Sequence, residues 1–426
     1  MIPENGRRIL FPGNYNIESF QRAPNRPLPE ISTFVVEKMP TFVRSIQTTK
    51  RNKRKYVPQI EEFALAAEEK IITTCQQKSY AEIIASLVTP EAQELALFDL
   101  IILQSALTTV GKREAQPKKT YRVLPSRMLT SLITDLSTAI DREVTTLTYA
   151  DVIFTNPLDD DPRTFLPLST PEGREELDFY ETHARIEKSM RNVLGATVLV
   201  TDALLAEGVS QVPFAENMLR AVGLMTSEEF TKKMQRQKRV GSEQASRNNS
   251  TDMDVVLSGM TRVGIYMDPD RFSAFRPFFN PYPDLPEQNP AHFDGASGKF
   301  SASFPTWELL LSGDNLPDSR HSFNSRNYRY FSTAERELIN AAYKRVEKNK
   351  TLDGVCESIG DPQIILDLLH GADMMLKEFR IRHRKGVAKQ IPGALSGQVA
   401  GTGGEQNISQ FLDERRKFDL IRRPRE

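Results

Sequence analysis

Cysteine and histidine are scarce in this chain of 426 residues, which contains two cysteines and five histidines. Cys75 and Cys356 cannot build a disulfide framework or a thiolate zinc site, so both of those classes are excluded. The sequence also has no HExxH motif and no second histidine close enough to His383 to pair with it on a metal. A metal bound only by side chains is therefore poorly supported.

The chain also lacks a net charge, because 56 Lys and Arg residues balance 56 Asp and Glu residues. Bulk nucleic-acid binding usually needs a basic excess, so we expect no nucleic-acid partner. No uninterrupted apolar run approaches the ~20 residues that a membrane helix needs. The opening MIPENGRRILFPGNYN holds no apolar signal core. We therefore expect a soluble protein of the cytoplasm with no membrane partner.

The sequence contains many signals for the start of helices, and strand-like alternation of apolar and polar residues is scarce. Hydrophobic residues make up 39% of the chain, which is enough for a sizeable core. Three prolines stand where a helix is expected to begin, each after a Thr or Asp: Pro90, Pro269 and Pro362. Two Ser/Thr–Glu pairs have the spacing of capping boxes: Thr226 with Glu229, and Ser332 with Glu335. The sequence predicts a mostly α protein.

Irregular stretches suggest how the chain is divided. We interpret 155–174 as a linker between a smaller helical N-terminal domain, 1–154, and a large helical domain, 175–426. A second stretch, 277–303, is rich in proline and glycine, and such long loops are usually functional or disordered. The polar stretch 235–254 is expected to be disordered or to loop out at the surface.

Two histidines lie on predicted helices. His383 follows Phe379 by one turn and continues an apolar stripe that also includes Leu368, Ala372 and Met375. Such a residue is either a buried core histidine or an axial ligand of haem iron, because a porphyrin supplies four nitrogens itself. Phe179, His183 and Glu187 share one helix face through their spacing of four, which also fits a plain amphipathic helix.

The stretch FRIRHRKGVAKQI, followed by GTGG and FL, resembles the C-terminal signature of the indoleamine and tryptophan 2,3-dioxygenase superfamily. The resemblance implies that His383 ligates the iron of haem b and that Arg380 contacts a haem propionate. The turn 401–404 resembles the loop that closes over bound substrate. It implies substrate contacts for Thr402, through its hydroxyl, and for Gly403.

Further motifs occur in the same order as in that superfamily, and together they span residues about 120–420. They are YRVLPSRMLTSL with LTYADVIFTNP in 121–157, the face of 179–187, RFSAFRPFF in 271–279 and SGKFSASFPTWELLLSG in 297–313. The first hundred residues resemble the family only vaguely.

These motifs imply roles for further residues in the site. His183 would face the substrate indole and accept its N–H, and Arg276 would pair with an amino-acid carboxylate. The aromatic surface for a planar ring would come from Phe179 and Phe272. The remaining implied contacts are Ser297 and Gly298 in the distal loop, and Glu308, which would brace Arg380.

The resemblance implies a haem-dependent dioxygenase that inserts O₂ into the indole ring of L-tryptophan or a related amino acid, giving an N-formylkynurenine-type product. Lys299 and Phe300 depart from the pattern, since smaller or neutral residues are expected there, and 280–295 is a proline-rich insertion. Similarity to the pyrrolnitrin-pathway branch keeps monooxygenation or a rearrangement open. The sequence is also compatible with a non-catalytic haem-binding or haem-sensing protein and with a helical protein without cofactor, and it leaves the oligomeric state open.

Overall fold

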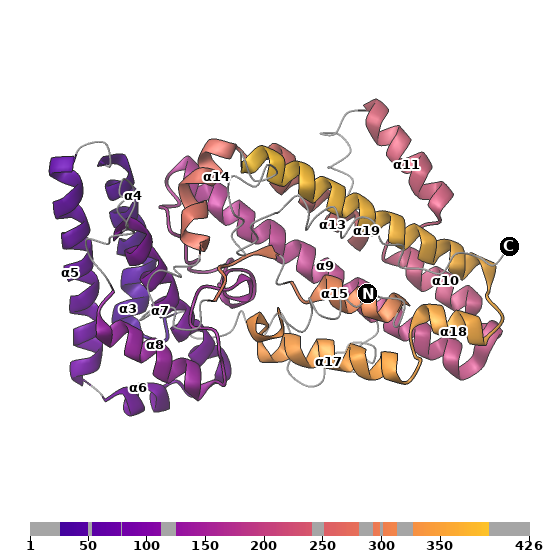
Figure 1. The fold of residues 1–426 in the computed structure, drawn as a ribbon, viewed down its shortest axis with the longest axis horizontal. Helices are drawn as coiled ribbons and strands as arrows, with labels where there is room; N and C mark the ends of the chain where they lie inside the picture. Colours follow the sequence, from indigo (N-terminus) through magenta and orange to yellow (C-terminus); the bar gives the residue numbers. More distant parts are fainter. Residues whose placement is uncertain are drawn as a thin grey trace.

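The computed structural model describes residues 26–49, 53–77, 79–111, 125–240, 251–280, 293–298, 301–312 and 327–391. These residues are 80% helical and contain no strand, so the predicted mostly α fold is confirmed. Figure 1 shows an elongated arrangement in which the N-terminal helices gather at one end and the later helices run along the rest of the molecule.

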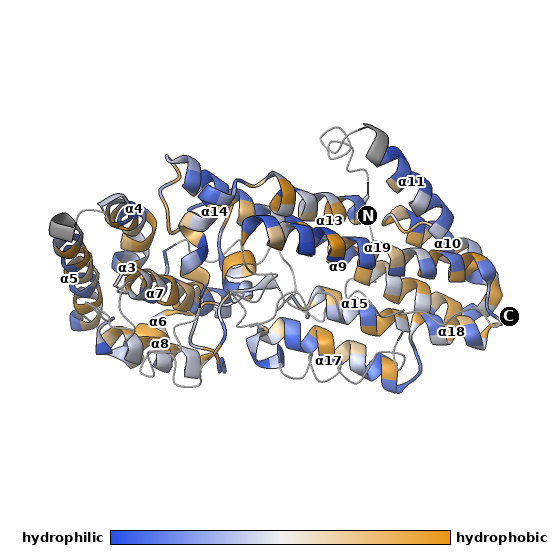
Figure 2. Cartoon of the chain, turned by 45° about the horizontal axis from the view of Figure 1, so that its top comes forward, coloured by the Kyte–Doolittle hydropathy of each residue, from blue (hydrophilic) through white to orange (hydrophobic). Residues whose placement is uncertain are grey.

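The N-terminal helices pack around one almost wholly buried helix, α7 (Pro90–Gly111). α7 is drawn largely in the hydrophobic colour in Figure 2, and its side chains are buried nearly all round. Its neighbours are α3 (Pro29–Thr33), η1 (Phe34–Lys38), α4 (Met39–Thr49), α5 (Lys53–Gln77), α8 (Arg127–Ala139) and η2 (Asp151–Thr155), and α6 (Tyr80–Ser86) packs on α8.

The rest of the molecule is organised on α9 (Pro171–Glu207), whose 37 residues make it about 55 Å long. Helices that pack directly against α9 are α10 (Val212–Ala221), α13 (Asp252–Thr261), α14 (Pro269–Phe275), α15 (Ser303–Ser312) and α18 (Leu352–Ser358). α13 also packs against α19 (Gln363–Gln390), as α11 (Ser227–Val240) does. The remaining elements are η3 (Gly208–Gln211), η4 (Arg262–Tyr266), η5 (Arg276–Phe279), η8 (Tyr328–Tyr330) and α17 (Thr333–Glu347).

Most of the predicted helix starts are confirmed. Both Ser/Thr–Glu pairs exchange the hydrogen bonds of a capping box, Ser332 with Glu335 and Thr226 with Glu229. One start differs: α19 begins at Gln363, with Pro362 in the capping position. Asp361 has a φ of 53°, a left-handed conformation that ends the preceding turn, so it does not cap α19. The stretch 235–254 also differs in part, because α11 continues to Val240 and α13 begins at Asp252.

The described part of the chain has two hydrophobic core clusters, and the first crosses the boundaries expected from the sequence. It contains the N-terminal helices together with Tyr180, Phe272 and Phe275 from much later in the chain. The second contains the later part of α9 with α10, α13, α15 and α17–α19. The stretch expected to be a linker is packed into the first cluster, where Arg163 and Phe165 are fully buried. A flexible connection there would expose both side chains, so this stretch holds the two parts together.

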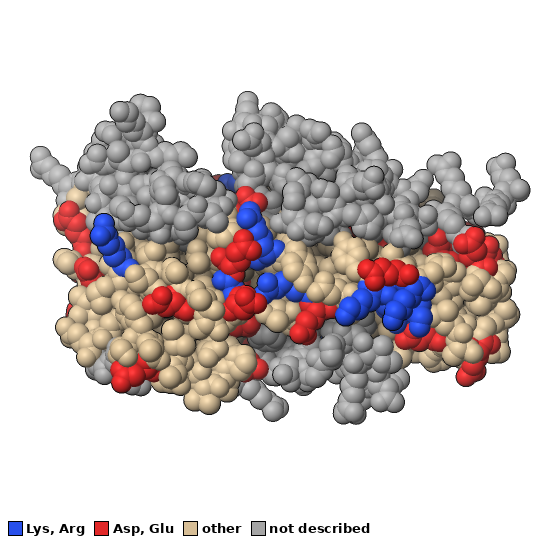
Figure 3. All heavy atoms as spheres, turned by 60° about the horizontal axis from the view of Figure 1, so that its bottom comes forward, with Lys and Arg blue, Asp and Glu red and all other residues tan. Residues whose placement is uncertain are grey.

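Two helical stretches among the described residues are long and apolar enough to cross a membrane by length and composition alone. They are α7, whose apolar window is 89% buried inside the protein, and Pro171–Ala221, whose window is half buried. Core helices of soluble proteins pass the same test, so these two give only weak support for a membrane span. On the face shown in Figure 3, basic and acidic side chains lie next to one another, in keeping with the balanced charge.

Candidate functional site

His183 lies in the first half of α9, and its surroundings fix its chemistry. Its Nδ1 is 2.8 Å from the carbonyl oxygen of Phe179. Because a carbonyl only accepts hydrogen bonds, Nδ1 carries the proton and Nε2 is left as an acceptor. Burial lowers the pKa of His183 to about 4, so the ring is neutral at pH 7. The residue can therefore accept a hydrogen bond from an N–H or O–H group, and it is a poor proton donor.

An aromatic cluster surrounds Phe179, one turn before His183. The Phe179 ring centroid lies 4.2 Å from that of His183 and 5.7 Å from that of Phe272. Phe275 and Phe279 follow at 5.8 Å each. The structure thus brings together Phe179, His183 and Phe272, as the resemblance implied, on α9 and α14. Edge and face contacts of this kind suit a planar apolar ring.

Arg276 begins η5 directly after α14, so in the chain it stands between Phe275 and Phe279 of the aromatic cluster. Its side chain is half-buried, and burial lowers the pKa of the guanidinium. Desolvation of a cation is offset most effectively by an anion that forms two parallel hydrogen bonds with it. The pairing of Arg276 with a carboxylate, which the resemblance implied, stays a prediction.

α15 and α19 are joined by a buried ion pair. Nη2 of Arg380 bonds Oε1 of Glu308, and both side chains are less than a tenth exposed. The rings of Phe304 and Phe379 stack beside this pair with centroids 4.4 Å apart. The two helices contribute residues 72 positions apart in sequence, so the contact implied by the resemblance is present. Its role toward a propionate stays a prediction.

His383 follows Arg380 on α19, and its side chain is half-buried. The helix is held on both sides of this histidine. One residue earlier, Arg382 donates to the Leu257 carbonyl and to Thr261. One turn later, Gly386 lies so close to Gly264 of η4 that a Cβ on Gly386 would be 2.5 Å from the Gly264 Cα. The segment that carries His383 is therefore fixed against α13 and η4.

A buried polar network that was not predicted from the sequence lies beside His183. The Tyr149 hydroxyl donates to Oε1 of Glu187 over 3.0 Å, and Ser303 Oγ donates to Oε2 over 2.6 Å. One turn further along α9, the guanidinium of Arg191 lies 4.8 Å from the centre of the Phe154 ring. The only signal was that Glu187 shares the face of His183, because its partners are 38 and 116 residues away.

Lys299, Phe300 and the whole turn 401–404, with Thr402 and Gly403, lie outside the described residues. Ser297 and Gly298 are described, and the carbonyl of Gly298 accepts from the backbone of Ser301. Their segment is anchored to η8, where the Tyr330 hydroxyl accepts from the backbone N–H of Asp294 over 2.8 Å. Among the residues that the structure describes, no hydrogen-bond partner is found for the buried Oγ of Ser301.

The implied residues therefore form two groups. One lies on α9, α14 and η5 and contains Phe179, His183, Phe272 and Arg276. The other lies on α15 and α19 and contains Glu308, Arg380 and His383. Among the described residues, no cluster of three or more His, Cys, Asp or Glu side chains could hold a metal ion.

A haem group fits the second group in the type of its donors. It needs one imidazole for iron and a cation for a propionate, and α19 carries both within one turn. The buried Glu308 keeps that cation in place. The chain matches no protein-family model and no curated protein.

Proposed function

We propose that the protein is a haem b–dependent dioxygenase that inserts O₂ across the C2–C3 bond of L-tryptophan or a related indole amino acid. The observation that supports the proposal best is the buried Glu308–Arg380 pair, one turn before His383. Burying two ionised groups is costly. The cost is accounted for if the pair orients an anionic propionate beside the axial histidine. The protein is proposed to act in the cytoplasm.

When bound, haem supplies the redox chemistry with O₂, and the chain's own residues bind and orient the substrate. Nε2 of His183 would accept the indole N–H, because this nitrogen is unprotonated at neutral pH. Arg276 would pair with the substrate carboxylate, and Phe179 with Phe272 would pack against the ring. The aromatic cluster would exclude water from the reacting face.

The proposal is tested first by absorption spectroscopy. We expect the purified protein to bind one haem per chain and to show a spectral shift on addition of L-tryptophan under reducing conditions. The variant His383→Ala should lose stable haem binding or recover it only with added imidazole. His370→Ala is the matched control, because this histidine is also half-buried on α19, and it should bind haem normally. An unchanged Soret band in His383→Ala would remove the proposed ligand and the proposal with it.

Isotope labelling separates the reaction from its rivals. With ¹⁸O₂, a dioxygenase retains both labelled atoms in one ring-opened product. One retained atom would indicate monooxygenation, and none would indicate a rearrangement of the pyrrolnitrin type. Haem binding with no product from any indole substrate would instead favour a haem-sensing protein.

A further inference from the structure

Glu187 receives hydrogen bonds from two distant parts of the chain. The side chain is 1% exposed, and each of its carboxylate oxygens accepts a different hydroxyl. Tyr149 donates from the short helical segment that runs into η2, and Ser303 donates from the first residue of α15. A buried carboxylate that accepts hydrogen bonds from two hydroxyls holds both hydroxyls in place, because no water can take over as their acceptor.

Tyr149 forms one wall around the His183 ring. The centroids of the Tyr149 and His183 rings are 6.0 Å apart with an interplanar angle of 80°. Tyr149 also makes an edge contact with Phe154, whose ring centroid is 6.3 Å from its own. Burial and the neighbouring Glu187 raise the pKa of Tyr149 well above its usual value, so the phenol keeps the proton that it donates. The orientation of this wall therefore depends on Glu187.

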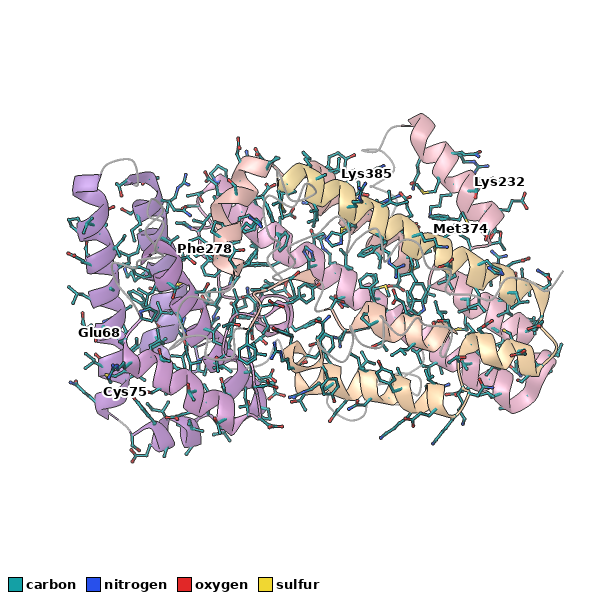
Figure 4. The ribbon with its side chains drawn as sticks, in the orientation of Figure 1. Glu68, Cys75, Lys232, Phe278, Met374 and Lys385 are labelled. Atoms are coloured by element: carbon teal, nitrogen blue, oxygen red, sulfur yellow. The ribbon has the colours of Figure 1, made fainter. Side chains whose placement is uncertain are left out.

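The Glu187 carboxylate also attaches the N-terminus of α15 to α9, through its hydrogen bond with Ser303. Two residues that follow on α15 make further links, since Trp307 Nε1 donates to Thr197 Oγ1 of α9 over 3.1 Å and Glu308 pairs with Arg380 of α19. α15 is thus attached to α9 at two points and to α19 at a third. Figure 4 shows the side chains of α9, α15 and α19 filling the region between these helices.

From these contacts we infer that Glu187 is a positioning residue with two linked tasks. It holds Tyr149 against His183, and through Ser303 it sets the position of the helix that carries Glu308. The inference deepens the proposed function and rests on it for the roles of His183 and His383. The contacts that link Tyr149, Glu187 and Ser303 are present in the haem-free protein.

The first experiment uses the full-length protein without haem, so it is independent of turnover. ¹⁵N-histidine NMR follows the imidazole signals, which are assigned to His183 by their loss in His183→Gln. Emission of Trp307, the one tryptophan of the chain, reports the seating of α15. We expect Glu187→Gln to shift both signals, Tyr149→Phe to shift mainly the His183 signal, and Ser303→Ala to shift mainly the Trp307 emission.

Tyr180→Phe is the matched control. The Tyr180 hydroxyl donates to buried Glu176 of the same helix over 2.6 Å, so this variant also removes one buried tyrosine–carboxylate bond. It should lower stability while leaving the NMR signal of His183 and the emission of Trp307 unchanged. Equal shifts in the control would show that any loss of a buried bond disturbs these reporters, and the inference would be overturned.

The second experiment uses the haem-loaded protein and compares L-tryptophan with its 1-methyl derivative, which has no indole N–H. Glu187→Gln and Tyr149→Phe should lower the ratio of the two kcat/KM values by about threefold to tenfold, the size of one weakened hydrogen bond. A merely structural loss would reduce both substrates equally.

Different results would contradict the proposed function and the role of Glu187. Wild-type protein that binds no haem would contradict the proposed function, while the NMR and emission shifts would still test the role of Glu187. Reporters unchanged in Glu187→Gln would end the inference, while haem binding would be unaffected. If Glu187→Gln does not fold, Ser303→Ala decides, because it removes a single oxygen: unchanged Trp307 emission would then overturn the linkage.

Discussion

Partial burial keeps the His183 ring neutral in the folded protein, so the stability of the protein should depend on pH through this residue. Its pKa of about 4 in the folded protein lies below the ordinary 6.5, so between these values the unfolded chain binds a proton that the folded chain does not. Stability should therefore fall as the pH drops from about 6.5 toward 4. Buried Glu176, whose pKa is raised to about 8, acts in the opposite direction, so the effect must be measured as a difference.

We expect the His183→Gln variant to gain stability relative to wild type as the pH falls. The difference in the free energy of unfolding should change by about 2 kcal/mol between pH 7 and pH 5. Urea denaturation of both proteins at the two pH values measures it. A difference independent of pH would show that the surroundings of His183 do not hold its ring in the neutral form.

Arg276→Leu tests the substrate-anchoring residue. Loss of a charge-assisted hydrogen bond of about 1.5–3 kcal/mol should raise the apparent Kd for an indole amino acid at least about tenfold, with haem content intact. An indole amine without a carboxylate should bind almost unchanged. Arg271→Leu is the control, because Arg271 is an exposed cation of α14 that pairs with Glu175, and this variant should bind both ligands normally. Equal losses for both ligands in Arg276→Leu would indicate a structural role.

At the scale of elements, the attachment of α19 to η4 depends on two facing glycines. A Cβ on Gly386 would approach the Gly264 backbone to 2.5 Å, which the backbone cannot absorb without moving. We expect Gly386→Ala to cost about 1–3 kcal/mol of unfolding free energy and to weaken haem binding through a displaced His383. Both are read from denaturation and haem titration.

Lys385→Ala provides the comparison for that variant. Lys385 is an exposed residue of α19, labelled in Figure 4, and its removal should change stability by less than about 0.5 kcal/mol. Similar changes in the two variants would mean that the close approach of Gly386 to Gly264 contributes nothing specific to the attachment of this segment.

Local chemistry allowed the helices to be predicted, because proline and capping pairs act within one turn of the residues that carry them. Ser332 and Glu335 are an example, and the apolar stripe that leads to His383 is another. The Glu187 network could not be predicted in that way, since its partners meet only after α15 has packed on α9. The contact between Glu308 and Arg380 was expected only through the family resemblance, because spacing alone gives no reason to pair residues 72 positions apart.

At the scale of the whole molecule, a fully buried ion pair joins α7 to the stretch that was expected to be a linker. Arg163 Nε donates to Oδ1 of Asp99 over 2.7 Å, and Ser32 donates to Oδ2 over 2.6 Å. Asp99→Asn would leave the guanidinium buried without its counter-charge. We expect a loss of about 3–5 kcal/mol in unfolding free energy, measured by chemical denaturation.

The exposed pair of Asp178 with Arg262 is the control for Asp99→Asn. Because solvent screens it, Asp178→Asn should cost less than about 1 kcal/mol. Equal losses of unfolding free energy in Asp99→Asn and Asp178→Asn would show that the buried pair stabilises the protein no more than the exposed pair does.

The way the first hydrophobic cluster is assembled has a consequence for synthesis of the protein. Its N-terminal helices are made first, but their core is closed by Tyr180, Phe272, Phe275 and Phe278, which a ribosome adds much later. Phe278 stacks on Phe165 with centroids 4.4 Å apart, and its carbonyl accepts from Ser105 of α7. A nascent chain that stops short of residue 280 therefore carries an unclosed apolar surface, and such surfaces are sites of chaperone binding and aggregation. Completion of the core around the N-terminal helices therefore waits until residues near 280 have been synthesised.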